Sequence, residues 1–264
     1  LLRSSYDRTA RLWDVDTGEE LRRFAGHTWW VWSAHFSPDE SNVVTASQDG
    51  TVLIWSVDRE VKSLPFRGHT GPVYDAVYSP DGRYIASAGY DKQVLLWETA
   101  GREPGTQRIN FDALLSDDPA AQVPDYLVIE GHTGPVRSVT FLDDGARLMS
   151  AGNDNTIKIW DVQRGQFVET LRGHAGWARC AVASRDGRVL SGSDDNEATI
   201  WDLTGYHETR VFRLAAHDDV VLDAAFSPSA TQIVTARRDR TARVWDFPAG
   251  ELRETLKEGH ALLI

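Results

Sequence analysis

Short stretches that mix β-branched and polar residues recur along the whole chain. Examples are NVVTAS at residues 42–47, TVLIW at 51–55 and TIKIW at 156–160, and turn sequences such as SPDG at 79–82 separate them. Alternation with a period of two is typical of strands, and none of these runs has the roughly 3.6-residue period of a helix. The pattern therefore predicts an all-β chain built from short strands.

The strand pattern repeats about every 42 residues. Gly-His pairs end at His27, His69, His132, His174 and His260, and Ala216-His217 holds the equivalent place. Tryptophans follow in step at Trp13, Trp55, Trp97, Trp160, Trp201 and Trp245. The step from His to the next Trp is 28 residues in four repeats and 27 in a fifth. Self-similarity at this period predicts a repeat architecture.

Two more columns keep the same rhythm. An Asp stands six residues before each Trp, at Asp7, Asp49, Asp91, Asp154, Asp195 and Asp239. A hydroxyl residue stands four positions before that Asp, at Thr45, Ser87, Ser150, Ser191 and Thr235, whereas Arg3 takes this position in the first repeat. Each later repeat thus offers one imidazole, one hydroxyl, one carboxylate and one indole at fixed spacing.

Four short strands per repeat, opened by Gly-His and closed by Trp-Asp, resemble the WD-repeat (WD40) β-propeller family over nearly the whole chain. Trp-Asp occurs at residues 13, 160, 201 and 245, and Ser56 and Glu98 replace the Asp in the other two repeats. Segments such as SPDG and YDRTARLWD are most similar to bacterial WD40 arrays joined to serine/threonine kinase domains.

The resemblance implies that the four columns form a buried network that braces each blade. Burial of imidazole and carboxylate groups requires that every polar atom be paired, which such a network provides. The implied sets are His27, Thr45, Asp49 and Trp55; His69, Ser87, Asp91 and Trp97; His132, Ser150, Asp154 and Trp160; His174, Ser191, Asp195 and Trp201; and His217, Thr235, Asp239 and Trp245.

Counting repeats predicts one propeller domain over residues 1–264 that is part of a larger ring. Residues 1–25 supply the last three strands of one blade, and five complete four-stranded antiparallel blades follow at about 27–66, 68–129, 131–171, 173–215 and 217–258. A propeller avoids open sheet edges by closing its ring, and seven blades is the common count in the family. We therefore expect a partial, originally seven-bladed propeller.

One segment breaks the rhythm. From Trp97 to His132 the distance is 35 residues, against 14 in three other repeats, so about 21 extra residues lie within 101–126 of the blade at 68–129. Its Gly, Pro and Asp content predicts a loop between the third and outer strands. A tolerated insertion and a functional loop both remain open.

The stretch GHTWWVWSAHF at residues 26–36 holds Trp29, Trp30 and Trp32. Strand alternation places residues 30 and 32 on one side and Val31 and Ser33 on the other. In the family, the residues beside this Val and the residue before the turn Asp lie at the top of the central channel and commonly contact partners. Those columns yield the candidate partner-binding residues Trp30, Trp32, Tyr74, Tyr90, Arg137, Trp177, Arg179, Leu222 and Arg238.

Local packing is the alternative use of these side chains. Trp29 stands where other repeats have Gly71, Gly134 and Gly176, so it could pack against an adjacent blade, and the arginines could be ordinary solvated surface. Trp, Tyr and Arg are nevertheless the residue types that dominate interface hot spots.

Composition narrows the partner classes. The net charge is −11, from 28 Lys and Arg against 39 Asp and Glu, without the clustered basic residues that phosphate binding needs, so we expect no nucleic acid. No apolar run reaches the roughly 18 residues of a membrane span, and no membrane association is expected. The single cysteine, Cys180, excludes an internal disulfide and fits a cytoplasmic location.

Enzyme signatures are absent from the sequence: there is no nucleophile elbow, phosphate loop, zinc motif or dinucleotide motif. His35 and His207 have no evident metal partner. We therefore predict no catalytic residues, no metal and no cofactor.

Three functions remain for comparison. The first is a scaffold that binds a protein or peptide on the top face. The second is a regulatory or sensing domain in cis, with a kinase domain elsewhere in the same parent chain. The third is a propeller enzyme with a site in the channel, which would need a concave pocket with perturbed carboxylates.

Overall fold

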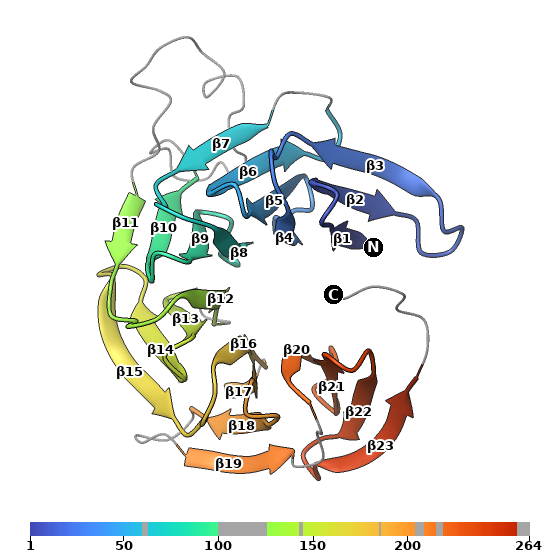
Figure 1. The fold of residues 1–264 in the computed structure, drawn as a ribbon, viewed down its shortest axis with the longest axis vertical. Helices are drawn as coiled ribbons and strands as arrows, with labels where there is room; N and C mark the ends of the chain where they lie inside the picture. Colours follow the sequence, from blue (N-terminus) through green and yellow to red (C-terminus); the bar gives the residue numbers. More distant parts are fainter. Residues whose placement is uncertain are drawn as a thin grey trace.

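The computed structural model describes residues 1–59, 63–99, 126–142, 145–184, 186–203, 209–214 and 219–257, and every regular element in them is a strand. The strands form one three-stranded and five four-stranded antiparallel sheets. Each sheet is one blade, and the blades follow one another around a central axis (Figure 1). The predicted all-β propeller, with a partial first blade and five complete ones, is confirmed. The count of seven blades stays a prediction.

Blade 1 consists of β1 (Leu2–Ser4), β2 (Thr9–Trp13) and β3 (Glu20–Ala25). Blade 2 holds β4 (Val31–Phe36), β5 (Asn42–Ser47), β6 (Thr51–Ser56) and β7 (Leu64–Arg67), and blade 3 holds β8 (Val73–Tyr78), β9 (Tyr84–Gly89), β10 (Val94–Glu98) and β11 (Tyr126–Ile129). Blade 4 holds β12 (Val136–Phe141), β13 (Arg147–Gly152), β14 (Thr156–Asp161) and β15 (Gln166–Arg172). Blade 5 holds β16 (Ala178–Ala183), β17 (Arg188–Ser193), β18 (Ala198–Asp202) and β19 (Thr209–Leu214), and blade 6 holds β20 (Val221–Phe226), β21 (Gln232–Arg237), β22 (Ala242–Asp246) and β23 (Glu251–Leu256).

The hydrophobic core lies between neighbouring blades. One cluster joins Val44 and Ile54 of blade 2 to Val73, Leu95 and Trp97 of blade 3, and four further clusters join the other neighbouring pairs in the same way. The two middle strands of blades 2 to 5 are buried on both faces, which explains their runs of apolar and small residues. Each blade is therefore stabilised mainly by its neighbours.

The innermost strand of every complete blade contains a β-bulge. In β4 the pairing with β5 shifts register between Val31 and Ser33, so Trp32 is the extra residue. The equivalent shifts in β8, β12, β16 and β20 leave Tyr74, Arg137, Arg179 and Leu222 as the extra residues. The strict alternation predicted for residues 30–33 is therefore wrong at this point, because a bulge re-aims the side chain that it carries.

The insertion predicted at 101–126 lies outside the described residues, except that Tyr126 already belongs to β11. Within blade 3, β10 and β11 pair directly, with Trp97 opposite Tyr126. The two strand ends that flank the insertion are therefore adjacent.

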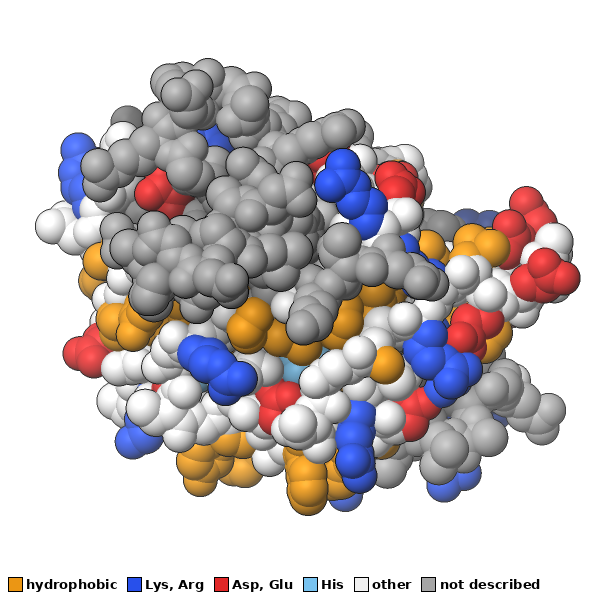
Figure 2. Space-filling view, turned by 90° about the horizontal axis from the view of Figure 1, so that it is seen from above, with side chains coloured by type: hydrophobic (Ala, Val, Ile, Leu, Met, Phe, Trp, Pro, Cys, Tyr) orange, Lys and Arg blue, Asp and Glu red, His pale blue; other side chains and the backbone are white. Residues whose placement is uncertain are grey.

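Acidic and basic side chains are intermixed on the side of the molecule shown in Figure 2, and hydrophobic side chains gather beside the atoms that are not described. None of the described residues belongs to a helix that is long and apolar enough to cross a membrane.

Candidate partner-binding rim

The repeating polar columns meet in a hydrogen-bonded network, seen first in blade 2. His27 Nδ1 lies 3.0 Å from Asp49 Oδ2, and His27 Nε2 lies 2.7 Å from Thr45 Oγ1. Trp55 Nε1 donates to the same Thr45 oxygen at 2.9 Å. Because the ionised Asp49 carboxylate can only accept, the imidazole proton is assigned to Nδ1, and Nε2 accepts from the Thr45 hydroxyl.

The same arrangement occurs in the next three blades. The His to Asp contacts are 3.0 Å for His69 and Asp91, 2.9 Å for His132 and Asp154, and 2.9 Å for His174 and Asp195. The hydroxyls of Ser87, Ser150 and Ser191 each accept from the indole of Trp97, Trp160 and Trp201. These side chains are nearly buried, as a structural brace requires, and a substrate has little access to them.

The first and last described blades depart from this pattern. In blade 6, Trp245 donates to Thr235 at 3.0 Å, but His217 lies outside the described residues, and Arg237 forms an ion pair with Asp239 at 3.0 Å. In blade 1, Asp7 pairs with Arg11 and accepts from Thr9. Both terminal carboxylates are more exposed than those in the middle blades.

The network shifts the carboxyl groups toward the ionised form. Burial alone raises the pKa of each Asp, but hydrogen bonds from His and from backbone N–H groups outweigh it. They lower the pKa of Asp195 to about 2, from an ordinary 3.8, through His174 and the backbone of Ala175 and Glu197. Asp49 and Asp154 shift in the same direction for the same reason.

His174, Asp195 and Glu197 are close enough to suggest a metal site, since their ligand atoms lie within 4.8 Å of one another. His174 Nδ1 is, however, already bonded to Asp195, and Glu197 is 2.5 Å from Arg213 Nη1. The donor atoms are used within the protein, so this cluster belongs to the brace of blade 5.

Aromatic side chains at the bulged ends of the innermost strands form a continuous chain of ring contacts. The Trp30 ring packs against Tyr6 at 5.0 Å and against Trp32 at 5.9 Å, and Trp32 continues to Tyr74 at 5.9 Å. Trp29 joins at 6.1 Å from Trp30. The Trp29–Trp30 pair is tilted and the other three contacts are edge-to-face; together they orient the rings while Trp30 remains 42% exposed.

Two arginines extend the chain into blades 4 and 5. The Arg137 guanidinium lies 4.1 Å from the Tyr74 ring centre and 5.9 Å from that of Trp177, and Arg179 lies 5.2 Å from Trp177. Trp177 is 43% exposed. We call Tyr6, Trp29, Trp30, Trp32, Tyr74, Arg137, Trp177 and Arg179 the aromatic rim.

Tyr90, Leu222 and Arg238 are not part of these contacts within the described part of the chain. Tyr90 is 56% exposed and lies over Gly71. Leu222 is half-buried at the bulge of β20, and Arg238 is exposed. The structure thus brings together six of the nine predicted partner-binding residues.

The structure also pairs two of the sequence columns with each other, which the spacing of the columns alone did not predict. The bulge residue bonds to the residue before the turn Asp: Trp32 Nε1 donates to Gln48 at 3.0 Å, and Arg137 Nε donates to Asn153 at 2.9 Å. Arg179 makes two bonds to Asp194, at 2.5 and 2.8 Å. The complementary residue types in the two columns were the available signal.

A second unpredicted contact lies nearer the central axis, on the innermost strands. His35 Nε2 of β4 is 3.3 Å from Asp75 Oδ1 of β8. Burial lowers the pKa of His35, but Asp75 outweighs this and raises it overall. Burial, together with repulsion from Asp75, raises the pKa of Asp223 on β20. The backbone N–H of Val139 donates to the other Asp75 oxygen, so Asp75 links blades 2, 3 and 4.

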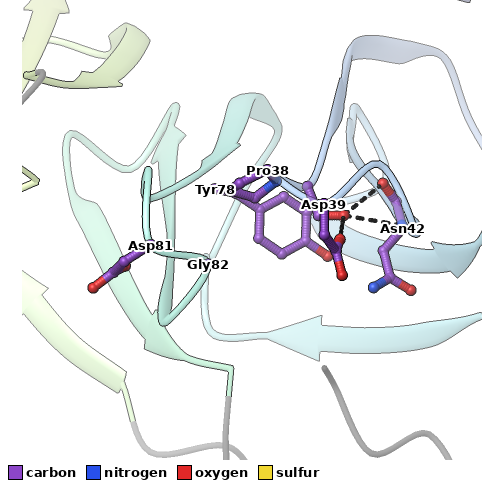
Figure 3. A pocket seen from close by; sticks show the side chains of 7 residues that line it. Pro38, Asp39, Asn42, Tyr78, Asp81 and Gly82 are labelled. Carbon is purple, nitrogen blue, oxygen red and sulfur yellow. Dashed lines mark hydrogen bonds between the residues drawn. The ribbon is translucent and has the colours of Figure 1, made fainter. Parts of the chain in front are cut away.

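A small pocket with a cavity volume of about 10 Å³ lies where β4 and β8 end, beside Phe36 and Tyr78 (Figure 3). It is lined by Ser37, Pro38, Asp39, Asn42, Tyr78, Asp81 and Gly82. The buried Tyr78 hydroxyl has no partner there, and burial raises its pKa well above the ordinary value. The pocket has room for about one ordered water, which would satisfy the hydroxyl.

Family comparison matches five segments to the WD domain, G-beta repeat, at residues 18–56, 59–98, 125–161, 165–202 and 208–246. Each segment begins near the outermost strand of one blade and ends near the third strand of the next, so the sequence repeat is staggered against the blade. This stagger ties neighbouring blades together covalently.

Several curated proteins are similar to the chain. WD repeat-containing protein 37 of Mus musculus is 32% identical over 247 residues, 92% of this chain and 45% of that protein. Nuclear distribution protein PAC1-2 of Uncinocarpus reesii is 31% identical over 158 residues, 49% of this chain and 34% of that protein. The U5 small nuclear ribonucleoprotein 40 kDa protein of Dictyostelium discoideum is 32% identical over 124 residues, 46% and 34% respectively.

The chain spans between a third and a half of the length of these relatives. The three are eukaryotic and none is named as a kinase, so the expected similarity to bacterial kinase-linked arrays finds no support among them. None of the three names describes an enzyme.

Proposed function

Because this chain belongs to the WD-repeat family (WD domain, G-beta repeat), we propose that it is a non-catalytic scaffold whose aromatic rim binds a peptide or protein. The single observation that carries this proposal is the continuous run of ring contacts from Tyr6 to Arg179 across five blades. Such a run gives a partner a large surface with few flexible side chains.

Exposure distinguishes the rim from the blade core. The indoles of Trp55, Trp97 and Trp160 are almost fully buried, whereas Trp30 and Trp177 remain more than two-fifths exposed. An exposed Trp that its neighbours hold in place loses little conformational freedom on binding, and such residues dominate interface energies. The rim thus has the composition and rigidity of a binding surface.

The channel-enzyme alternative has less support. The pKa values of His35 and Asp223 near the axis are raised, but Asp75, which acts on both groups, is already engaged by His35 and by the backbone N–H of Val139. The name of one relative places it in a ribonucleoprotein, an assembly of several chains, which favours the scaffold. A regulatory role in cis depends on segments beyond this chain and is compatible with the same rim.

Co-precipitation from the source lysate tests the proposal. The double variant Trp30→Ala, Trp177→Ala removes two exposed indoles that stand directly before the inner strands β4 and β16, and leaves the half-buried Trp32 in place. Phe167→Ala is the matched control, because Phe167 is an exposed aromatic on the outermost strand β15. We expect a protein that wild type and the control retain and the double variant loses, at equal melting temperatures. Retention by all three would contradict a binding role for the rim.

A further inference from the structure

We propose that Arg137 is the anion-binding residue of the rim and that it binds the carboxylate of an Asp or Glu in an extended peptide. Apolar residues that flank this acidic residue pack on Trp30 and Trp177. This inference rests on the proposed function and adds to it the chemistry of the partner. It is carried by the position of the Arg137 guanidinium, which has no ion-pair partner among the described residues, beside the Arg179–Asp194 ion pair.

The Arg137 side chain is held between aromatic faces without a charged partner. Its Nε donates to the neutral amide oxygen of Asn153, and its guanidinium stacks 4.1 Å from the Tyr74 ring centre. Within the described residues no carboxylate lies at ion-pair distance from it. Stacking and the Asn153 bond fix the plane of the guanidinium and hence the direction of its terminal NH₂ groups.

Asp194 does not fill this role, because Arg179 already uses both of its oxygens at 2.5 and 2.8 Å. Arg179 and Asp194 therefore neutralise each other, and the charge of Arg137 remains as an excess of one positive charge at this part of the rim. The chain as a whole carries −11, so this excess is a local feature that an acidic ligand can recognise by charge complementarity.

Partial burial removes water from the Arg137 guanidinium, so a bound carboxylate would stabilise its charge. Desolvation lowers the pKa of Arg137, and the neighbouring positive charge of Arg179 acts in the same direction. An arginine nevertheless stays protonated in proteins, so the charged form persists without full compensation. A carboxylate that arrives in the plane of the fork supplies two charge-assisted hydrogen bonds and removes that penalty.

A single carboxylate fits this site better than a phosphate dianion. The excess charge is one, and the Asp194 carboxylate is close enough to act on the charge of Arg137. A dianion would leave one negative charge uncompensated beside this carboxylate.

Selection of displayed random peptides on the full-length protein tests the inference. We expect enrichment of Asp or Glu at one position, with apolar residues beside it. A synthetic peptide from the enriched pool should bind wild type on the order of 10- to 100-fold more tightly than its Asn or Gln counterpart, the range for a hydrogen bond to a charged group.

Three variants test whether Arg137 causes the preference for the acidic peptide. Arg137→Gln should bind the acidic peptide and its amide counterpart equally, and Arg137→Lys, which keeps the charge without the fork, should retain part of the preference. Arg67→Gln, which removes an exposed arginine of the outermost strand β7, should behave as wild type. Melting temperatures of all variants are compared first, and Arg137→Lys carries the test if Arg137→Gln is unstable.

The outcomes separate this inference from the proposed function. An acid preference that persists in Arg137→Gln, or a phosphoserine counterpart that binds more tightly than the acidic peptide, overturns the inference. Peptides that bind without acid preference and are lost in Trp30→Ala overturn it while leaving the proposed function in place. Failure to select any peptide overturns both.

Discussion

The bracing network shows how single residues make a polar blade interior stable. In blade 4, His132 contacts Asp154 and Ser150 at once, and Trp160 donates to the same serine. Every strong donor and acceptor has a partner, so burial carries no large desolvation penalty. Removal of one member should therefore lower the free energy of unfolding mainly because it leaves its buried partners without a hydrogen bond.

Replacement of Asp154 by alanine should therefore lower the free energy of unfolding by about 1 to 3 kcal/mol, because it leaves His132 and the N–H of Thr133 without their acceptor. Denaturant titration measures the change. Asp58→Ala, at an exposed turn position, is the control and should change stability by less than about 0.5 kcal/mol. Equal effects of the two substitutions would contradict the bracing role.

Acid should weaken the same network. The folded pKa of Asp195 is about 2 and the ordinary value is 3.8, so its stabilising contribution is complete above the ordinary value and is lost as the pH falls toward 2. Asp195→Asn should lower stability near neutral pH and lose less on acidification than wild type. Unfolding curves of both proteins at several pH values below 5 would show the gap closing, and parallel curves would refute the linkage.

Sequence spacing predicted which residues form the network, because the columns are set by the blade repeat. It did not predict the contact between His35 and Asp75, which joins adjacent inner strands and has no periodic counterpart. It also missed Arg237, which pairs with Asp239 in the blade whose His217 is not described. Both depend on contacts particular to one or two blades.

At the level of elements, the bulge in each innermost strand decides what the rim presents. The same bulge carries Trp32, Tyr74, Arg137, Arg179 and Leu222 in successive blades. Alternation along a single strand could not reveal it, because a bulge is a property of the pairing between two strands. Alignment of the repeats nonetheless identified the bulge residues as candidates, because the bulge occurs at the same position of each repeat.

Blade 5 shows a compensation between two paired strands. Cys180 of β16 faces Gly192 of β17, whereas the equivalent second-strand residues are Ala46, Ala88, Ala151 and Ala236. A Cβ at Gly192 would lie 3.0 Å from Cys180 Sγ and 2.7 Å from Val221 Cγ1. A methyl group at position 192 would therefore crowd both side chains.

Gly192→Ala should destabilise the protein by about 1 to 3 kcal/mol through overpacking. Adding Cys180→Ser recreates the Ser–Ala pair of blades 2 and 4 and should recover part of that loss. A double-mutant cycle from thermal or denaturant unfolding gives the coupling energy. Additive effects would show that Val221 alone sets the limit.

Across the whole molecule, stability comes from contacts between neighbouring blades arranged around the axis (Figure 1). Each blade depends on the next, and the stagger of the sequence repeat links them in the chain. Substitutions or deletions confined to the circumference should therefore have little effect on folding. Substitutions between two blades should destabilise both of them.

The segment that joins β10 to β11 tests this expectation. Replacement of residues 103–124 by a short Gly-Ser joiner should leave the melting temperature within a few degrees of wild type, because Trp97 and Tyr126 already pair and a tight connection can link them. Thermal unfolding measures the outcome. Loss of folding would show that the segment contributes to a blade.

Site-specific photo-crosslinking tests the central claim, that the partner binds on the aromatic rim, most directly. A photoreactive phenylalanine analogue is placed at position 30 in one protein and at position 167, on the outermost strand β15, in another. The account predicts that the protein recovered with wild type crosslinks from position 30 and not from position 167. Crosslinking from position 167 alone would place the partner on the circumference and contradict the rim as the binding surface.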